Sequence, residues 1–358
     1  MSPEPRQPDA LLDALAQVAP GTPLRDGLDR IVRAKMGALL VLSDSIDVLA
    51  ICSGGFLLDA PFSPQRLSEL AKMDGAIILA ADGSRIARAN VHLVPDSNVS
   101  TVETGTRHRT AERVARSLDA PVISVSEEMS VINVYVGDQK HQLQEVGRLL
   151  DRANQALQTL ERYKVRLDDA MANLTALEVE DVVTLRDVAA VVQRGEMVHR
   201  IANEIETMIV ELGVDARLLR LQLDELYTEI DVEIDLVIGD YLPVDCTAAD
   251  THRLMSALSS DEVLDLRKSA IALGPCGAVP DDLDQALAPR GMRLLARVPR
   301  LTPEAVKAIT NHFGELTKLQ RATLADLLDV PDVTRAQAQA IKDTLARVVE
   351  STIMDQYN

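Results

Sequence analysis

The chain has 358 residues and a formal net charge of −18, because 55 Asp and Glu residues outnumber 37 Lys and Arg residues. A hydrophobic content of 47% excludes wholesale disorder, and the length suits two or three domains with a substantial core. No apolar run reaches the roughly 18–20 residues that a membrane span needs, and the Pro-rich start lacks the apolar stretch of a signal peptide. We therefore expect a soluble, cytoplasmic protein that does not contact a membrane.

Residue usage excludes further classes. The three cysteines, Cys52, Cys246 and Cys276, are scattered without a CxxC pair, so neither a disulfide framework nor a zinc site is indicated. Trp is absent and Phe and Tyr are few, which argues against a protein that stacks single-stranded bases on aromatic rings. The acidity also argues against a general nucleic-acid coat, although it leaves room for a local phosphate site.

The charge is unevenly distributed along the chain. Residues 1–150 carry a net charge of −4, residues 151–290 carry −15, and residues 291–358 carry +1. The hydrophobic period changes at nearly the same places. We therefore predict three domains: an α/β domain at 1–145, a helical spine at 146–290 and a small all-α domain at 291–358.

Helical and strand-like stretches alternate in the first domain. In chain order we expect a helix near Pro23–Lys35, a strand at Gly37–Leu42, a second apolar run at Asp47–Cys52, a helix at Gln65–Met73, a strand at Gly75–Ala81, a strand-like stretch at Ser84–Val94, a helix near Arg107–Leu118 and β-rich runs at Pro121–Val125 and Val131–Val136. Asp82-Gly83 is a strong hairpin signal. Apolar strands interleaved with helices predict a sheet that is covered on both faces.

The middle of the chain has a helical period. From about Lys140 to Leu273, apolar residues recur every three or four positions, which predicts packed helices with a solvated acidic face. The stretch Asp215–Tyr241 is expected to be one long acidic helix. Its carboxylates do not have a spacing typical of metal ligands, so we interpret the region as a helical spine.

The last segment contains a short internal repeat. The sequence from Val298 to Ile309 recurs from Val330 to Ile341, and each copy is a Pro-containing turn that opens a helix. A helical connector lies between the copies. This arrangement predicts two small helix–turn–helix units packed as a pair.

The most unusual feature is the helix start at Gly105–Arg113, because Arg107-His108-Arg109 crowds the end of a helix that is already positive. Free backbone N–H groups at a helix start form a phosphate site, and Arg side chains add bidentate contacts to phosphate oxygens. The pattern favours anion binding. The alternative is a solvated helix start whose Arg side chains pair with neighbours such as Glu103 or Glu112.

A second candidate site is Asp74-Gly75-Ala76, at the entrance to an apolar strand. A carboxylate followed by small residues can bind a metal ion or polarise a hydroxyl while the backbone approaches a ligand. An ordinary Asp-Gly turn has the same sequence. The chain lacks the P-loop, GxGxxG, HExxH and nucleophile-turn motifs of other enzyme classes. Taken with the basic helix start, Asp74 therefore indicates phosphoryl transfer.

At these two motifs the sequence resembles the DNA-integrity-scanning diadenylate cyclases, the DisA family. The family's Asp-Gly-Ala motif matches Asp74-Gly75-Ala76, its Arg-His-Arg motif matches Arg107-His108-Arg109, and the intervening Val91–Asp96 is also similar. The acidic helical middle and the paired terminal hairpins match the same layout, so the resemblance covers almost the whole chain. It implies an α/β cyclase domain with a central mixed sheet flanked by helices, a helical spine and a C-terminal helix-hairpin-helix domain.

The resemblance also implies a reaction, the condensation of two ATP into cyclic di-3′,5′-AMP with release of two pyrophosphates, and Mg²⁺ or Mn²⁺ as cofactor. Two cyclase domains would face one another, each presenting one ATP, within a homo-octamer. Asp74 would bind the metal and activate the 3′-hydroxyl, whereas Arg107, His108 and Arg109 would hold the phosphates and stabilise the developing charge. The nucleotide pocket would be lined by Gly75, Ala76, Leu93, Thr106, Thr110 and Ser126.

The chain departs from the family pattern in two places. Glu127 and Glu128 follow Ser126 where DisA members often carry basic residues, which reverses the local charge. The second hairpin has Pro331-Asp332-Val333-Thr334 instead of a glycine-rich turn, so that a carboxylate stands where a DNA phosphate would approach.

The candidate DNA contacts are therefore few: Arg300, Thr302, Thr334 and Arg335. With a segment charge of only +1, we expect weak, salt-sensitive, sequence-independent binding to branched or duplex DNA. One alternative is a non-catalytic scaffold that binds branched DNA and only senses a nucleotide. Another is a purely structural helical oligomer, which leaves the basic helix start unexplained.

Overall fold

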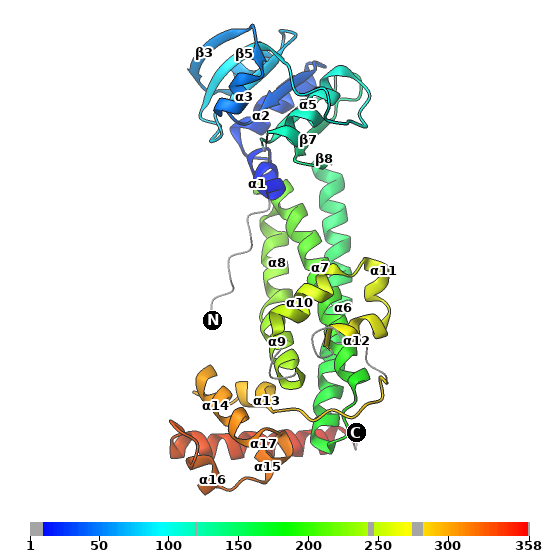
Figure 1. The fold of residues 1–358 in the computed structure, drawn as a ribbon, viewed down its shortest axis with the longest axis vertical. Helices are drawn as coiled ribbons and strands as arrows, with labels where there is room; N and C mark the ends of the chain where they lie inside the picture. Colours follow the sequence, from blue (N-terminus) through cyan, green and yellow to red (C-terminus); the bar gives the residue numbers. More distant parts are fainter. Residues whose placement is uncertain (1–9, 119, 243–246, 274–281, 357–358) are drawn as a thin grey trace. The chain divides into compact units, whose positions relative to one another are not determined.

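The structure, a computed structural model, describes residues 10–118, 120–242, 247–273 and 282–356, with side chains as far as Ser351 (Figure 1). It divides into two compact units, one made of Met1–Ala156 and Glu204–Gln222, the other of Leu157–Asn203 and Leu223–Asn358. Cys246 and Cys276 lie outside the described residues. No helix in the described part of the chain is long and apolar enough to cross a membrane.

The first unit is built on a mixed β-sheet. Among the described residues, eight strands pair in the order β2-β5-β4-β1-β6-β7-β8, with β3 also paired to β5. Only β1 and β4 run parallel within this described sheet. The strands are β1 (Ala38–Val41), β2 (Cys52–Ser53), β3 (Phe56–Pro61), β4 (Ala76–Leu79), β5 (Arg85–Leu93), β6 (Val122–Val125), β7 (Ile132–Val136) and β8 (Gln139–Gln142).

Helices cover both faces of this sheet, as the apolar strands predict. Leu40 and Ile77 pack into a cluster with one set of helices, whereas Leu39 and Ile78 pack against the other set, because neighbouring strand residues point to opposite faces. The first set is α1 (Ala10–Gln17), α2 (Pro23–Arg33) and α4 (Pro64–Leu70), and the second is α3 (Ile46–Ala50) and α5 (Thr106–Ser117).

Strand direction gathers the candidate residues at one edge of the sheet. The parallel strands β1 and β4 begin at this edge, and the antiparallel strands β5 and β6 end there, because Ala76 pairs with Val91 and Ala38 pairs with Val125. The segments just outside these strand ends therefore lie close together. We call this the amino edge, after the starts of β1 and β4.

Two local predictions have different outcomes. The Asp82-Gly83 hairpin is confirmed, since Gly83 has φ +68° and the Asp82 carboxylate accepts the Ser84 N–H at 3.0 Å between β4 and β5. The apolar run at Asp47–Cys52 is helical over most of its length. Ser45 caps α3 by accepting the Val48 N–H at 3.4 Å, which starts a helix in place of a strand.

The middle of the chain is helical, as predicted, but one predicted helix is broken. The helices are α6 (Val146–Glu180), α7 (Leu185–Leu212), the 3₁₀ turn η1 (Gly213–Ala216), α8 (Arg217–Tyr227) and α9 (Ile230–Tyr241). A single helix over Asp215–Tyr241 is therefore wrong. Glu229 has φ +67°, a left-handed conformation that separates α8 from α9.

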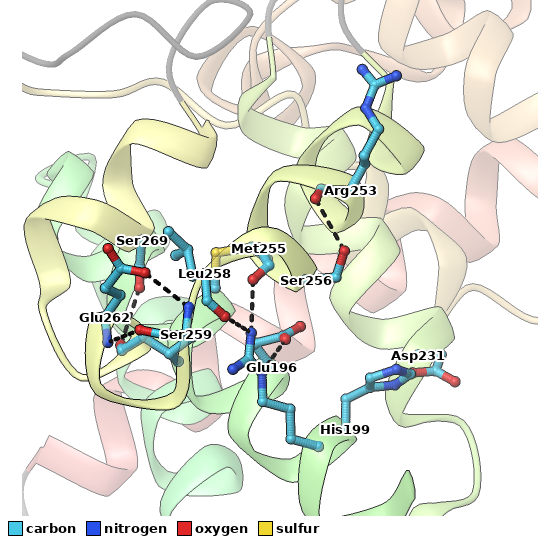
Figure 2. A network of polar contacts seen from close by, with 12 residues as sticks. Glu196, His199, Asp231, Arg253, Met255, Ser256, Leu258, Ser259, Glu262 and Ser269 are labelled. Carbon is cyan, nitrogen blue, oxygen red and sulfur yellow. Dashed lines mark hydrogen bonds and ion pairs between the residues drawn. The ribbon is translucent and has the colours of Figure 1, made fainter. Parts of the chain in front are cut away.

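Polar side chains of α7 hold three short helices, α10 (Ala248–Ala257), α11 (Ser260–Val263) and α12 (Leu266–Leu273). Arg200 pairs with Glu196 at 2.6 Å and donates to the carbonyl oxygens of Met255 and Leu258 at 2.9 and 2.7 Å (Figure 2). Both carbonyls lie at the end of α10. The Met255 carbonyl also accepts the Leu258 N–H at 3.1 Å, so the guanidinium adds a second hydrogen bond there and gives the terminal Leu258 carbonyl a partner. Gln193 likewise donates to the Val263 carbonyl of α11 at 2.6 Å.

The terminal helices confirm the repeat. They are α13 (Met292–Ala296), α14 (Pro303–Phe313), α15 (Leu316–Arg321), α16 (Leu324–Leu328) and α17 (Arg335–Gln356). Residues from both copies, such as Ile309 and Ile341, share one buried cluster. Arg300 and Asp332 stand at equivalent positions of the two turns and have nearly the same φ, +64° and +65°.

Candidate active site

The N-terminus of α5 has the character of an anion site. Its N-cap is Gly105, which has φ +60° and provides no side-chain cap, and its first turn contains no acidic residue. The first backbone hydrogen bond joins the Arg109 N–H to the Gly105 carbonyl at 3.0 Å. A helix start that lacks an anionic cap leaves its N–H groups and its dipole available to a ligand.

The structure brings the two predicted motifs together at the amino edge. Arg107 points from the first turn of α5 toward Asp74, and the distance from its Nη2 to the Asp74 Oδ1 is 3.8 Å. Gly37, just before β1, leaves the space for this side chain, since a Cβ there would lie 2.1 Å from the Arg107 Nη1. The Asp74 carboxylate is fully exposed.

The alternative of a self-neutralised helix start is not what the structure shows. Glu103 pairs with Lys140 at 2.5 Å, and Glu112 pairs with Arg116 at 3.1 Å. Arg109 is exposed and has no hydrogen bond or ion pair with any described residue. Arg107 thus lies beside Asp74 and Arg109 faces solvent, and neither pairs with Glu103 or Glu112.

His108 is held by a buried polar group that the sequence did not reveal. Its Nδ1 lies 2.8 Å from the Ser124 Oγ and 3.1 Å from the Tyr135 Oη, and the Tyr135 hydroxyl donates to Glu103 at 3.3 Å. Ser124 and Tyr135 are almost completely buried in β6 and β7. The available signal was polar residues inside two otherwise apolar strands, which require a hydrogen-bond partner when they are buried.

The other residues predicted to line a nucleotide pocket also lie at the amino edge. Several of them pack in the core or form hydrogen bonds within the domain. Position 75 has no room for a side chain, since a Cβ there would lie 2.6 Å from the Asn90 Cα. Ala76 is buried at the start of β4. Leu93 is only 5% exposed and belongs to the core beneath α3 and α5. The remaining three lie on the helix start or the next turn: Thr106 is exposed, Thr110 donates to the Thr106 carbonyl at 2.9 Å, and Ser126 accepts the Met129 N–H at 3.3 Å. Their contacts with a nucleotide stay predictions.

A divalent cation would find one carboxylate at this place. Within the described residues there is no group of three or more His, Cys, Asp or Glu side chains that could hold a metal ion. Mg²⁺ is commonly bound by one or two carboxylates that share it with substrate phosphates and water. The exposed Asp74 fits that mode, and it does not fit a preformed protein cage.

The candidate DNA contacts lie on the two terminal turns. Thr302 and Thr334 cap α14 and α17 by accepting the N–H groups of Ala305 and Gln337, each at 3.3 Å. Arg300, Arg335 and Asp332 are exposed on these turns. The structure therefore presents two cations and one carboxylate at the predicted DNA surface.

Comparison with known proteins decides the family. Residues 25–140 match the model "DisA bacterial checkpoint controller nucleotide-binding", residues 143–279 match "DisA bacterial checkpoint controller linker region", and residues 292–347 match "SAM-like Helix-hairpin-helix tandem". The chain is 51% identical to the DNA integrity scanning protein DisA of Parafrankia sp. (strain EAN1pec), with 98% of each chain covered. The chain belongs to the DisA family.

Other DisA proteins are equally similar. The protein of Frankia casuarinae is 51% identical with 98% of each chain covered, and that of Kineococcus radiotolerans is 50% identical over 98% of this chain and 99% of the relative. DisA-family membership confirms the predicted fold class: an α/β diadenylate cyclase domain, a helical linker and a helix-hairpin-helix domain. The exact domain limits at 145 and 290 stay predictions.

Proposed function

We propose that this DisA-family chain condenses two ATP into cyclic di-3′,5′-AMP with release of two pyrophosphates, and that its C-terminal domain couples the reaction to DNA structure. The observation that carries the proposal is the meeting of Asp74 and Arg107 at the uncapped start of α5. This place lies within the residues that match the DisA nucleotide-binding model.

The charges at this place suit the reaction. Each half-reaction joins a 3′-hydroxyl oxygen of one ATP to the α-phosphorus of the other and breaks the bond from that phosphorus to the β-phosphate. The hydroxyl loses its proton, and pyrophosphate leaves with the electrons of the broken bond. Negative charge therefore grows on the α-phosphate and the leaving group, where Arg107, Arg109 and the first N–H groups of α5 would stabilise it.

Asp74 is the residue that we propose for the cation and for the attacking hydroxyl. Bound Mg²⁺ or Mn²⁺ would offset phosphate charge and polarise the phosphoryl oxygens. The carboxylate itself would accept the hydroxyl proton or orient the hydroxyl toward phosphorus. Full exposure of Asp74 suits both roles, because substrate can reach it without rearrangement of the core.

A second subunit would complete the site. Asp74, Thr106 and Arg109 are all exposed, so a nucleotide bound here would lie at the surface of its own domain. One such surface presents one ATP, whereas the reaction needs two in opposite orientations. We propose that two cyclase domains face one another, within an octamer.

The terminal domain would provide weak contact with branched or duplex DNA. Its match to a tandem helix-hairpin-helix model supports a role at phosphates, and the exposed Arg300 and Arg335 are available for it. The exposed Asp332 opposes such contact. Binding should therefore be sequence-independent and fall steeply with salt.

The test is incubation of the full-length protein with ATP and Mg²⁺ or Mn²⁺, with cyclic di-AMP measured by mass spectrometry and the oligomer checked by light scattering. Asp74→Asn and Arg109→Ala should each abolish the product without lowering Tm, and chelation of the metal should do the same reversibly. Arg148→Ala removes a surface charge from α6, where the side chain is 82% exposed, and serves as the matched control.

The outcomes separate the hypotheses. A folded oligomer that yields no product overturns the proposed reaction. Tight ATP binding without turnover would instead favour the non-catalytic scaffold. Near-normal rates in both variants would show that Asp74 and Arg109 do not have the roles assigned to them.

A further inference from the structure

The buried contacts of His108 favour one position for the proton of its ring. The Tyr135 hydroxyl has one proton, and the geometry directs it to the Glu103 carboxylate at 3.3 Å. A carboxylate paired with Lys140 at 2.5 Å has no proton to give back. The Tyr135 oxygen can then only accept from the His108 Nδ1, 3.1 Å away, whereas the Ser124 hydroxyl, 2.8 Å from the same nitrogen, can either donate or accept. A hydrogen on Nδ1 is therefore the arrangement in which both contacts are hydrogen bonds, with Ser124 accepting.

Burial of the ring favours its neutral form. Burial lowers the pKa of His108, and the positive charges of Lys140 and Arg107 add to this effect, whereas Glu103 opposes it. Burial also raises the pKa of Tyr135, with Glu103 acting in the same direction, so its hydroxyl remains a donor. A neutral ring with its proton on Nδ1 has a lone pair on Nε2, which can accept a hydrogen bond but cannot donate one.

The accepting nitrogen, Nε2 of His108, lies on the side of the ring that faces the N-terminus of α5. A Cβ on Gly105 would lie 3.9 Å from Cδ2, the carbon next to Nε2. No hydrogen bond joins Nε2 to a residue in the described part of the chain. An accepting nitrogen repels phosphate oxygens, so its suitable partner is a donor group such as a ribose hydroxyl or the adenine amine.

We propose that Ser124, Tyr135 and Glu103 are positioning residues that hold His108 as the Nδ1–H tautomer, so that its Nε2 accepts a hydrogen bond from a nucleotide hydroxyl or amine. This role rests on the proposed function, and it differs from a phosphate contact by His108. Arg107 and Arg109 then bind the anionic part of the nucleotide, while His108 recognises a neutral donor.

Solid-state ¹⁵N NMR of sedimented, histidine-labelled, nucleotide-free protein tests the tautomer directly, whatever the size of the oligomer. The His108 signals are identified by difference from His108→Gln. We expect Nδ1 to be protonated and Nε2 unprotonated at pH 7.5.

In Tyr135→Phe, which keeps the buried ring but removes the hydroxyl, a substantial share of His108 should move to the Nε2–H tautomer. The kcat for cyclic di-AMP should fall at least about tenfold, with a smaller change in KM for ATP.

The matched control is Tyr227→Phe, which removes a tyrosine hydroxyl from the Nδ1 of His199 in the linker. It should leave the His108 signals and the kcat unchanged. Ser124→Ala is the second variant if Tyr135→Phe does not fold. An Nε2–H tautomer in the unmodified protein overturns the proposal, and so does a Tyr135→Phe variant with unchanged tautomer and kcat. Because the tautomer is read without nucleotide, failure to cyclise ATP would reject the proposed function alone.

Discussion

The Nη2 of Arg107 lies 3.8 Å from the Oδ1 of Asp74, so the Arg-His-Arg and Asp-Gly-Ala motifs meet across the amino edge of the sheet. This distance is too long for a hydrogen bond. The Asp74 oxygens and the Arg107 N–H groups therefore do not satisfy one another and can still bind other groups. A strong ion pair would instead have satisfied both groups within the protein. The loose contact therefore leaves a carboxylate and a guanidinium side by side, one for a cation or a hydroxyl and the other for a phosphate.

Gly37→Ala tests this arrangement without touching either charge. A Cβ on Gly37 would lie 2.1 Å from the Arg107 Nη1 and 2.6 Å from its Cζ. The guanidinium is the far end of a flexible side chain, so it can move away, and the cost in stability should stay below about 1 kcal/mol. We expect cyclic di-AMP formation to fall roughly tenfold or more, because misplacing a charge by an ångström weakens transition-state stabilisation.

The control for this variant is Gly147→Ala, at a helical position with open space around the added Cβ. It should leave the rate unchanged and raise stability by less than the roughly 0.5–1 kcal/mol of a mid-helix position, because Gly147 lies in the first turn of α6. Rates and thermal unfolding are measured for both variants. A Gly37→Ala enzyme with full activity would show that the observed place of Arg107 is not needed.

Sequence patterns predicted the features that depend on neighbouring residues. The Asp82-Gly83 hairpin, the helix at Arg107–Leu118 and the terminal repeat each rest on local turn or period signals, and the structure contains all three. The helix break at Glu229 is not predictable from the sequence, because no Gly or Pro marks it and Glu rarely adopts a left-handed conformation. The group around His108 depends on cross-strand neighbours of β6 and β7, which a single sequence does not align.

The two terminal turns offer a matched pair of substitutions. Arg300 and Asp332 have the same left-handed backbone at equivalent positions, so replacing either with Gly should stabilise its turn by up to about 1 kcal/mol. Their effects on DNA should be opposite. Arg300→Gly removes a cation and should lower affinity and reduce the salt slope by about 1, whereas Asp332→Gly removes a repelling charge and should raise affinity.

Fluorescence anisotropy with a branched and a linear duplex, each at several salt concentrations, measures both effects. Because the backbone change is shared, a difference in affinity between the variants reports the charge alone. Equal affinities would mean that these two turns do not contact DNA.

A buried ion pair joins α6 to the first helix of the terminal domain. Arg293 is 2% exposed and pairs with the equally buried Glu178, which also accepts the Tyr241 hydroxyl at 2.7 Å. Arg293→Met leaves Glu178 buried without its cation, and we expect a loss of about 3–5 kcal/mol in the stability of this unit. Adding Glu178→Leu should recover most of that loss, because it removes the unpaired charge. Urea unfolding of Arg293→Met, Glu178→Leu and the double variant checks this, and independent, additive losses would contradict a direct pair.

Asp240 should make the stability of the same unit depend on pH. Burial raises the pKa of its carboxyl from the ordinary 3.8 to about 6, although the backbone N–H groups of Arg293 and Met292 oppose the shift. Because the pKa is higher in the folded state, protonation favours folding. This contribution is complete below the pKa of the unfolded state and is lost as pH rises through about 6.

Between pH 4.5 and pH 7.5, the wild type should therefore lose about 1–3 kcal/mol of unfolding free energy relative to Asp240→Asn, which cannot titrate. The exposed Asp343→Asn is the control and should follow the wild-type curve, whereas parallel curves for wild type and Asp240→Asn would show that this carboxyl has an ordinary pKa.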